Sequence, residues 1–271
     1  MFLARLLVLF SLVCISCAHS SFEQKQLKHA LDFATSNRLE LEILLQHYTY
    51  DSLKLEAAKF LIRNMPHCYS YQQGGEMDSV KRVRTYYSPF GQIDQTYARR
   101  WGHYTYRNLP KIYDAHIITA EYLIDNIDRA FDNWQKRPWN RSLSFEDFCE
   151  YLLPYRIGDE PREEWRELYE KKYGYLLDSI YKGSDVVEAA NLVSRHLQEP
   201  VFIYCEDFEL PHIGPRYLFS HRYGSCVDAA DIVTYAFRAV GIPCMEDTDA
   251  RGGHVWNVVR DTTGRDVPIW Y

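Results

Sequence analysis

Apolar residues recur at helical spacing through most of the chain between residues 22 and 200. The clearest of these stripes covers residues 117–134, and Pro138 ends it because proline cannot continue a helix. Shorter stripes begin at Asp51 and Ser144, which are residue types that cap helix N-termini. This pattern predicts a mostly helical N-terminal part.

Towards the C-terminus the pattern becomes mixed. Residues 201–204 are strand-like, whereas residues 226–240 have helical spacing and end at Gly241. Beyond them, residues 255–260 and 265–271 are strand-like, and the turn residues between the two runs predict a hairpin. The chain is therefore expected to have an α+β fold.

Two residues in this C-terminal part have the chemistry of a thiol-based catalyst. Cys226 opens the predicted helix, and the positive end of the helix dipole favours a thiolate there over a thiol. His254 follows Gly252 and Gly253 at the start of a predicted strand, where an imidazole can take up the thiol proton. Taken singly, a cysteine on a helix is usually a small buried hydrophobe, and a lone histidine is usually structural. The combination of both residues with their flanking glycines favours catalysis.

The same residues resemble the core of the transglutaminase-like superfamily, whose fold is similar to that of papain-like cysteine proteases. The matching segments are Gly224-Ser-Cys-Val-Asp228, Arg238-Ala-Val-Gly-Ile-Pro243 and Gly253-His-Val-Trp-Asn257. The resemblance covers residues 185–271 and implies a papain-like core with Cys226 as nucleophile and His254 as its base. Upstream, residues 148–165 resemble a segment that precedes this core in large bacterial envelope proteins.

The family's third catalytic residue is an acid, and the predicted hairpin bears on where it lies. With a short turn, the numbers of cross-strand partners sum to about 525 or 526. Asp266 then lies roughly 17–20 Å from His254 along the strands, and Asp261 is further away. The family's acid is therefore expected around Trp270 or just past Tyr271. Either the core continues beyond Tyr271 or the triad is incomplete, and the first is expected because the chain ends inside an apolar strand.

The N-terminus has the features of an export signal. A short positive segment precedes about ten mostly apolar residues, 6–15, which are too few to span a bilayer as a helix. Ser16 and Cys17 resemble the lipobox of bacterial lipoproteins, although Cys14 stands where leucine is preferred. The chain is expected to be an exported, lipid-anchored envelope protein with Cys17 as the lipidated residue; the alternative is an ordinary signal peptide.

Composition narrows the classes of partner. A net charge of −6, without a clustered basic face, argues against nucleic acid. The 22 tyrosines and six tryptophans fit either interfaces or an aromatic core. The cysteines after Cys17 form no CxxC pair, and His67, His103 and His116 lack ligand spacing, so neither a metal nor a disulfide framework is expected. Cys244 is expected to be a buried strand residue, and no cofactor motif is present.

Together these features predict a signal segment over 1–17, a helical domain over 18–180 and a transglutaminase-like core over 181–271. The predicted function is cysteine-dependent acyl transfer on an amide or peptide, by hydrolysis or by cross-linking to an amine. The substrate is expected to be a peptide or protein, or cell-wall or glycan material, and the lipid anchor would attach the protein to the membrane. The alternative is a non-catalytic envelope module that binds peptide or glycan.

The lipobox interpretation makes a prediction about location. Changing Cys17 to Ala is expected to move the protein from the membrane fraction to the soluble exported fraction, because stable anchoring needs the acyl chains on this residue. Fractionation of cells expressing each form measures the shift. If the Cys17→Ala protein fractionates like the wild type, an ordinary signal peptide is the better account.

Overall fold

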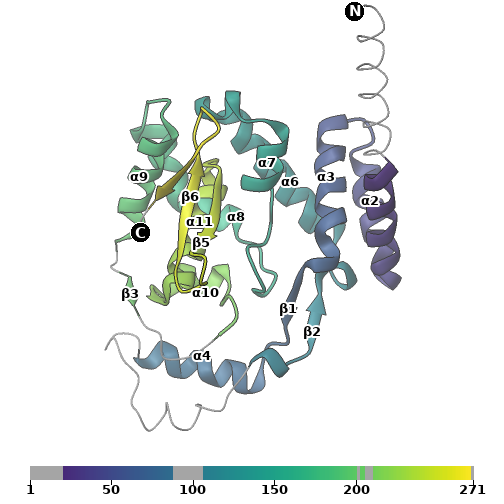
Figure 1. Ribbon diagram of the computed structural model, residues 1–271, viewed down its shortest axis with the longest axis horizontal. Helices are drawn as coiled ribbons and strands as arrows, with labels where there is room; N and C mark the ends of the chain where they lie inside the picture. Colours follow the sequence, from purple (N-terminus) through teal and green to yellow (C-terminus); the bar gives the residue numbers. More distant parts are fainter. Residues whose placement is uncertain (1–20, 88–105, 200–201, 205–209, 270–271) are drawn as a thin grey trace, which may run out of the picture. The chain divides into compact units, whose positions relative to one another are not determined.

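The computed structural model describes residues 21–87, 106–199, 202–204 and 210–269, and its fold is α+β as expected (Figure 1). The predicted signal segment with Cys17, as well as Cys205 and His103, lies outside these residues. Contacts divide the chain into two compact units. The first comprises Met1–Cys68 and Tyr113–Ala120, and the second comprises Tyr69–Ile112 and Glu121–Tyr271.

The first unit is helical. After a helical segment over residues 21–33, its elements are η1 (Thr35–Asn37), α2 (Arg38–His47), α3 (Ser52–Asn64), η2 (Met65–His67) and η5 (Asp114–His116). Asp51 caps α3, because its side chain accepts a hydrogen bond from the backbone N–H of Lys54. The apolar faces of α2 and α3 are buried through Leu41, Leu44, Leu61 and Ile62. The predicted cap and helical stripe are confirmed.

The second unit contains the remaining helices and the sheets. Its helical elements are α4 (Gly75–Tyr87), η4 (Tyr106–Asn108), α6 (Ala120–Lys136), η6 (Pro138–Ser142), α7 (Phe145–Tyr151), α8 (Arg166–Tyr175), η7 (Leu176–Ile180), α9 (Val186–Leu197), α10 (Pro215–Ser220) and α11 (Cys226–Val240). Its strands are β1 (Tyr69–Tyr71), β2 (Lys111–Tyr113), β3 (Ile203–Tyr204), β4 (Tyr223–Gly224), β5 (Cys244–Thr248), β6 (Val255–Arg260) and β7 (Asp266–Ile269). The predicted cap of α7 is confirmed, since the hydroxyl of Ser144 accepts from the N–H of Asp147.

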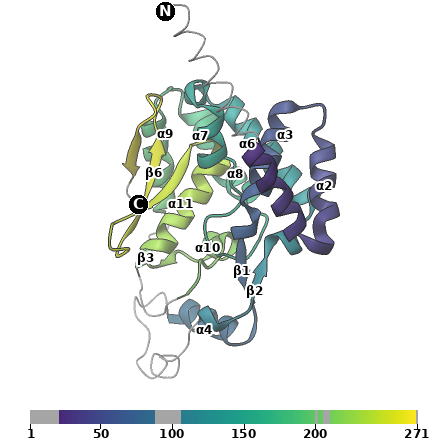
Figure 2. The ribbon, with the colours of Figure 1, turned by 45° about the vertical axis from the view of Figure 1, so that its right-hand side comes forward.

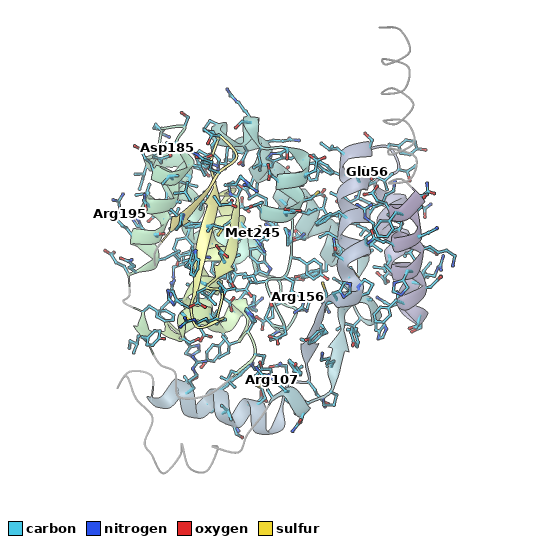
Figure 3. All side chains as sticks on the ribbon, in the orientation of Figure 1. Glu56, Arg107, Arg156, Asp185, Arg195 and Met245 are labelled. Atoms are coloured by element: carbon cyan, nitrogen blue, oxygen red, sulfur yellow. The ribbon has the colours of Figure 1, made fainter. Side chains whose placement is uncertain are left out.

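Helix α11 lies at the centre of this unit, between α8 and the three-stranded sheet β5–β6–β7 (Figures 1 and 2). Every residue from Ala230 to Val240 is buried, which is the condition of a helix packed on all sides. Large buried side chains such as Tyr169, Tyr235 and Phe237 belong to the core around it. Figure 3 shows how side chains fill the space between the helices and the sheet. The ends of α11 therefore have little freedom to move relative to the sheet.

The C-terminal end of α11 is closed by a glycine and by buried donors. Gly241 has φ +82°, and a Cβ on it would lie 2.7 Å from the carbonyl oxygen of Asn133, so only glycine fits. The indole N–H of Trp139 and the amide of Asn140 both donate to the carbonyl of Gly241. The guanidinium of Arg137 donates to the carbonyl of Val240. These bonds satisfy carbonyls that a helix end leaves without intrahelical partners.

The sheet has the predicted hairpin register. Asn257 lies opposite Ile269 and Arg260 opposite Asp266, so partner numbers sum to 526. The strand-like run at 201–204 forms only the short β3, which pairs in parallel with β4 rather than joining the main sheet. Cys244 is a fully buried strand residue, as expected. The four described cysteines are all free thiols, and none of the described helices is long and apolar enough to cross a membrane.

The cap of α9 provides a test of these local interactions. The carboxylate of Asp185 accepts from the backbone N–H groups of Val187 and Glu188. Asp185→Ala is expected to cost about 1 kcal/mol, which lowers the melting temperature by about 2–4 °C in a unit of this size. Asp185→Ser, which keeps an oxygen acceptor, is the control and should melt close to the wild type in calorimetry. Equal melting of all three forms would show that the cap contributes nothing.

Candidate functional site

The structure brings Cys226 and His254 to the lining of one cavity of about 180 Å³. Cys226 is the first residue of α11, and His254 directly precedes β6, so the cavity lies where the helix N-terminus meets the sheet. Aromatic side chains from Phe202, Tyr204 and Trp256 form part of its wall. The thiol is partly exposed and the imidazole is exposed, so both are accessible from solvent.

The N-terminus of α11 is held by a buried ion pair. The carboxylate of Asp228 accepts from the backbone N–H of Ser225 at 2.8 Å and from its hydroxyl at 3.2 Å. The guanidinium of Arg84, from α4, lies 2.8 Å from the same carboxylate, and both side chains are less than a tenth exposed. A Cβ on Gly224 would lie 2.2 Å from this carboxylate oxygen. A side chain at position 224 would therefore clash with Asp228, and Ser225 is held by hydrogen bonds to the same carboxylate.

This helix end also has the polarity that an acyl-transfer site needs. The first N–H groups of an α-helix have no intrahelical acceptors, so those around Cys226 are suited to a developing oxyanion. Ser220, His221 and Tyr223 lie shortly before Cys226 in the sequence and are candidates for a second donor. Of these, Ser220 is exposed, and one ring nitrogen of His221 is hydrogen-bonded to the carbonyl of Tyr217.

The loop between β5 and β6 positions His254. The side chain of Asp249 accepts from the N–H groups of Arg251 and Gly253, at 3.1 and 2.7 Å. The carbonyl of His254 accepts from the N–H of Asp249 and from the hydroxyl of Thr248. Asp249 thus organises the turn.

The two acids that follow His254 in the sequence, Asp261 and Asp266, have other partners. The carboxylate of Asp261 accepts hydrogen bonds within the β6–β7 turn, above all from Thr263. These bonds lower the pKa of Asp261 to about 2. Asp266 accepts from the phenol of Tyr151 at 3.0 Å and pairs with Arg260. Because Asp266 lies opposite Arg260, it is about 20 Å along the strand from His254. The expected position of the acid, around Trp270 or past Tyr271, lies outside the described residues.

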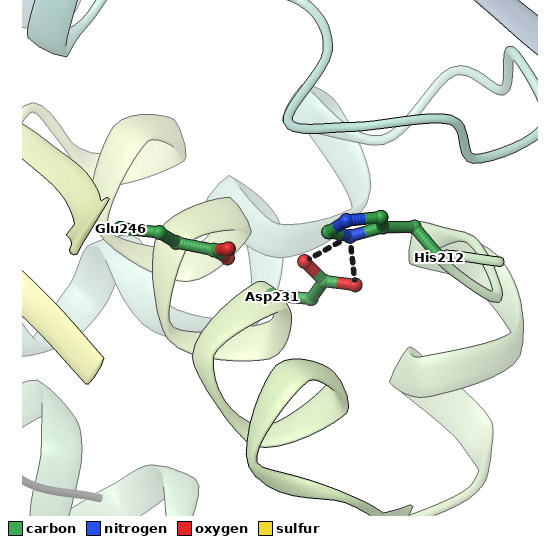
Figure 4. A group of neighbouring side chains, drawn as sticks. All are labelled: His212, Asp231 and Glu246. Carbon is green, nitrogen blue, oxygen red and sulfur yellow. Dashed lines mark hydrogen bonds and ion pairs between the residues drawn. The ribbon is translucent and has the colours of Figure 1, made fainter. Parts of the chain in front are cut away.

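A second polar group on α11 has no counterpart in the sequence prediction. His212, Asp231 and Glu246 converge from a loop, a helix and a strand (Figure 4). The three residues are 19 and 15 positions apart in the sequence, which matches no ligand motif. One feature of the sequence could have pointed to this group, namely the carboxylate of Asp231 within an apolar helical run. Arg84 was missed for the same reason, since 144 residues separate it from Asp228.

Comparison with known proteins finds no matching family model, no matching curated protein and no matching solved structure.

The Arg84–Asp228 pair makes a prediction about the integrity of the site. Arg84→Met leaves the buried carboxylate without its cation, which is expected to cost about 3 kcal/mol. Arg82→Met, an exposed arginine in the same helix, is the matched control and should stay within about 0.5 kcal/mol of the wild type. Urea unfolding measures both. Equal stability of the two variants would mean that the pair does not hold the N-terminus of α11.

Proposed function

We propose that this protein is a cysteine-dependent acyl-transfer enzyme of the cell envelope, with a papain-like, transglutaminase-like core over residues 181–271. The observation that carries the proposal is the shared cavity of Cys226 and His254 at the N-terminus of a buried helix. The helix supplies a positive dipole end and, at Cys226 and Val227, first-turn N–H groups that have no intrahelical acceptors. The β5–β6 loop supplies the imidazole of His254, and hydrogen bonds with Asp249 hold the backbone of this loop.

In the proposed reaction, the imidazole of His254 takes the proton of the Cys226 thiol, and the sulfur attacks an amide carbonyl carbon. The carbonyl oxygen becomes an oxyanion that first-turn N–H groups of α11 stabilise. The intermediate then collapses, the C–N bond breaks, and the imidazolium returns the proton to the leaving amine. The resulting thioester is resolved by water, which gives hydrolysis, or by a second amine, which gives a cross-link.

The cavity also limits what the substrate presents to the thiol. A volume of about 180 Å³ holds a side chain or a short acyl group rather than a whole peptide. Phe202, Tyr204 and Trp256 offer flat apolar surfaces to such a group. A peptide or protein that inserts one residue, including a peptide of the cell wall, fits this arrangement.

The second candidate is a non-catalytic module that binds peptide or glycan. The aromatic wall of the cavity favours it, because the rings bind such ligands without any chemistry at the thiol. Asp261 and Asp266 also favour it, since both have partners other than His254. The two candidates differ in one measurable property, the reactivity of Cys226.

Alkylation with iodoacetamide, followed by peptide mapping, tests the proposal. Cys226 is expected to react much faster than Cys149 and Cys244, which are buried. Burial raises the pKa of the Cys244 thiol to about 12, so this residue serves as the internal reference for an inactive cysteine.

The dependence on the imidazole separates activation from mere exposure. His254→Ala is expected to slow the labelling of Cys226 about tenfold or more, because the base is lost. His196→Ala removes a histidine outside the cavity and is expected to change nothing. If Cys226 labels at the same rate in both variants, the thiol is exposed but not activated, and the binding module becomes the better account.

A further inference from the structure

The group formed by His212, Asp231 and Glu246 lies apart from the thiol cavity, since none of the three lines it. Nδ1 of His212 is 2.8 and 3.0 Å from the two carboxylate oxygens of Asp231. The carboxylate of Glu246 points toward the same place from β5 (Figure 4). One potential ligand atom from each residue lies within 4.8 Å of the other two.

The surroundings fix these side chains in position. The backbone N–H of His212 donates to Asp159, and a Cβ on Gly158 would lie 2.3 Å from Nε2 of the ring. The ring therefore packs directly against the backbone at Gly158, with Nδ1 facing Asp231. The hydroxyl of Thr234 donates to Glu246 at 3.4 Å. Such outer partners are what orient the ligands of protein metal sites.

The three groups share one buried environment, which shifts the pKa of each. Asp231 is fully buried, and burial raises the pKa of its carboxyl as well as that of Glu246. Burial opposes charge on His212, but its acidic neighbours Asp231, Glu160 and Glu246 together outweigh it and raise the imidazole pKa to about 11. Protons and a metal ion would therefore compete for the same ligand atoms.

Other charged and titratable groups facing the cluster are Glu160, Arg238 and Tyr235. Glu160 accepts from the N–H groups of Ile157 and Gly158, and the guanidinium of Arg238 donates to the carbonyls of Tyr151, Cys244 and Arg156. Arg238 thus contributes a positive field without a direct bond to either carboxylate of the cluster. A divalent cation with two ionised carboxylates and one neutral imidazole would form a set without net charge.

We propose that His212, Asp231 and Glu246 bind a divalent transition-metal ion, Zn²⁺ or Mn²⁺. One imidazole nitrogen and two carboxylates form a ligand set that suits these ions, whereas Mg²⁺ and Ca²⁺ prefer oxygen ligands alone. In binding, the ion forms bonds to Nδ1 and to one oxygen of each carboxylate, and any proton on those atoms is released to solvent. The ion ties together the loop before α10, the middle of α11 and β5.

The test uses the purified full chain after treatment with a chelator. Zn²⁺ and Mn²⁺ are each titrated by calorimetry, with MgCl₂ as the comparison ion, in buffers of different ionisation enthalpy. We expect one transition-metal ion per chain, an affinity that rises with pH, and release of up to two protons on binding. Mg²⁺ is expected to bind much more weakly. If wild-type protein binds neither Zn²⁺ nor Mn²⁺ at any pH from about 6 to 8, the cluster holds only protons and the proposal is wrong.

Variants locate the binding. Asp231→Asn and Glu246→Gln keep the side-chain shapes and are expected to weaken binding about a hundredfold or more. Asp228→Asn changes another buried aspartate of α11 outside the cluster and is expected to retain one ion, as is Cys226→Ala. Metal-dependent melting provides a second readout, with a rise in Tm for wild type that Asp231→Asn lacks. Loss of the ion in Cys226→Ala, with binding retained in Asp231→Asn, would place the ion at the thiol and overturn the proposal.

Discussion

The burial of α11 from Ala230 to Val240 is the constraint on which the second unit depends. A helix surrounded by α8, α9 and the sheet has little solvent around it, so protein groups take the place of water at its ends. At the N-terminal end the carboxylate of Asp228 serves as an acceptor, and at the C-terminal end Trp139 and Asn140 serve as donors. The C-terminal donors lie 102 and 101 positions away in the chain, and they hold that end of the helix in place.

The candidate active site is a consequence of that placement. Because α11 cannot slide, Cys226 stays where the helix N-terminus meets β6, and the short β5–β6 loop carries His254 to the same cavity. The Arg84–Asp228 pair extends this dependence to α4, since a change there alters the support beneath Cys226. Stability and the proposed chemistry are therefore coupled through one helix end.

The same helix carries the cluster for which we propose a metal ion. Asp231 lies five residues after Cys226, which turns it to a different face of the helix, towards His212 and Glu246 rather than the thiol cavity. A buried carboxylate in the middle of an apolar helix costs stability unless it has a cation or a proton. The imidazole of His212 lies beside this carboxylate, and the proposed ion would bring positive charge to it in place of the imidazole proton.

Local patterns in the sequence determined the boundaries of α11, the caps at Asp51 and Ser144 and the register of the β6–β7 hairpin. Each of these depends on residues a few positions apart, where periodicity, capping and turn geometry act directly. The coarse α+β class also agrees with the sequence prediction, and the structure places Cys226 and His254 on the lining of one cavity.

Only the tertiary structure decided the partner of Asp228, the grouping of His212 with Asp231 and Glu246, and the short parallel pairing of β3 with β4. These interactions join residues from about 15 to more than 100 positions apart, and no local period records them. The role of Asp249 was hidden for a different reason. From the sequence alone, an acid in a loop is expected to be exposed to solvent. Only the structure shows the backbone N–H groups that donate to its carboxylate. Packing, which brings distant polar groups together where water cannot reach them, determined these features.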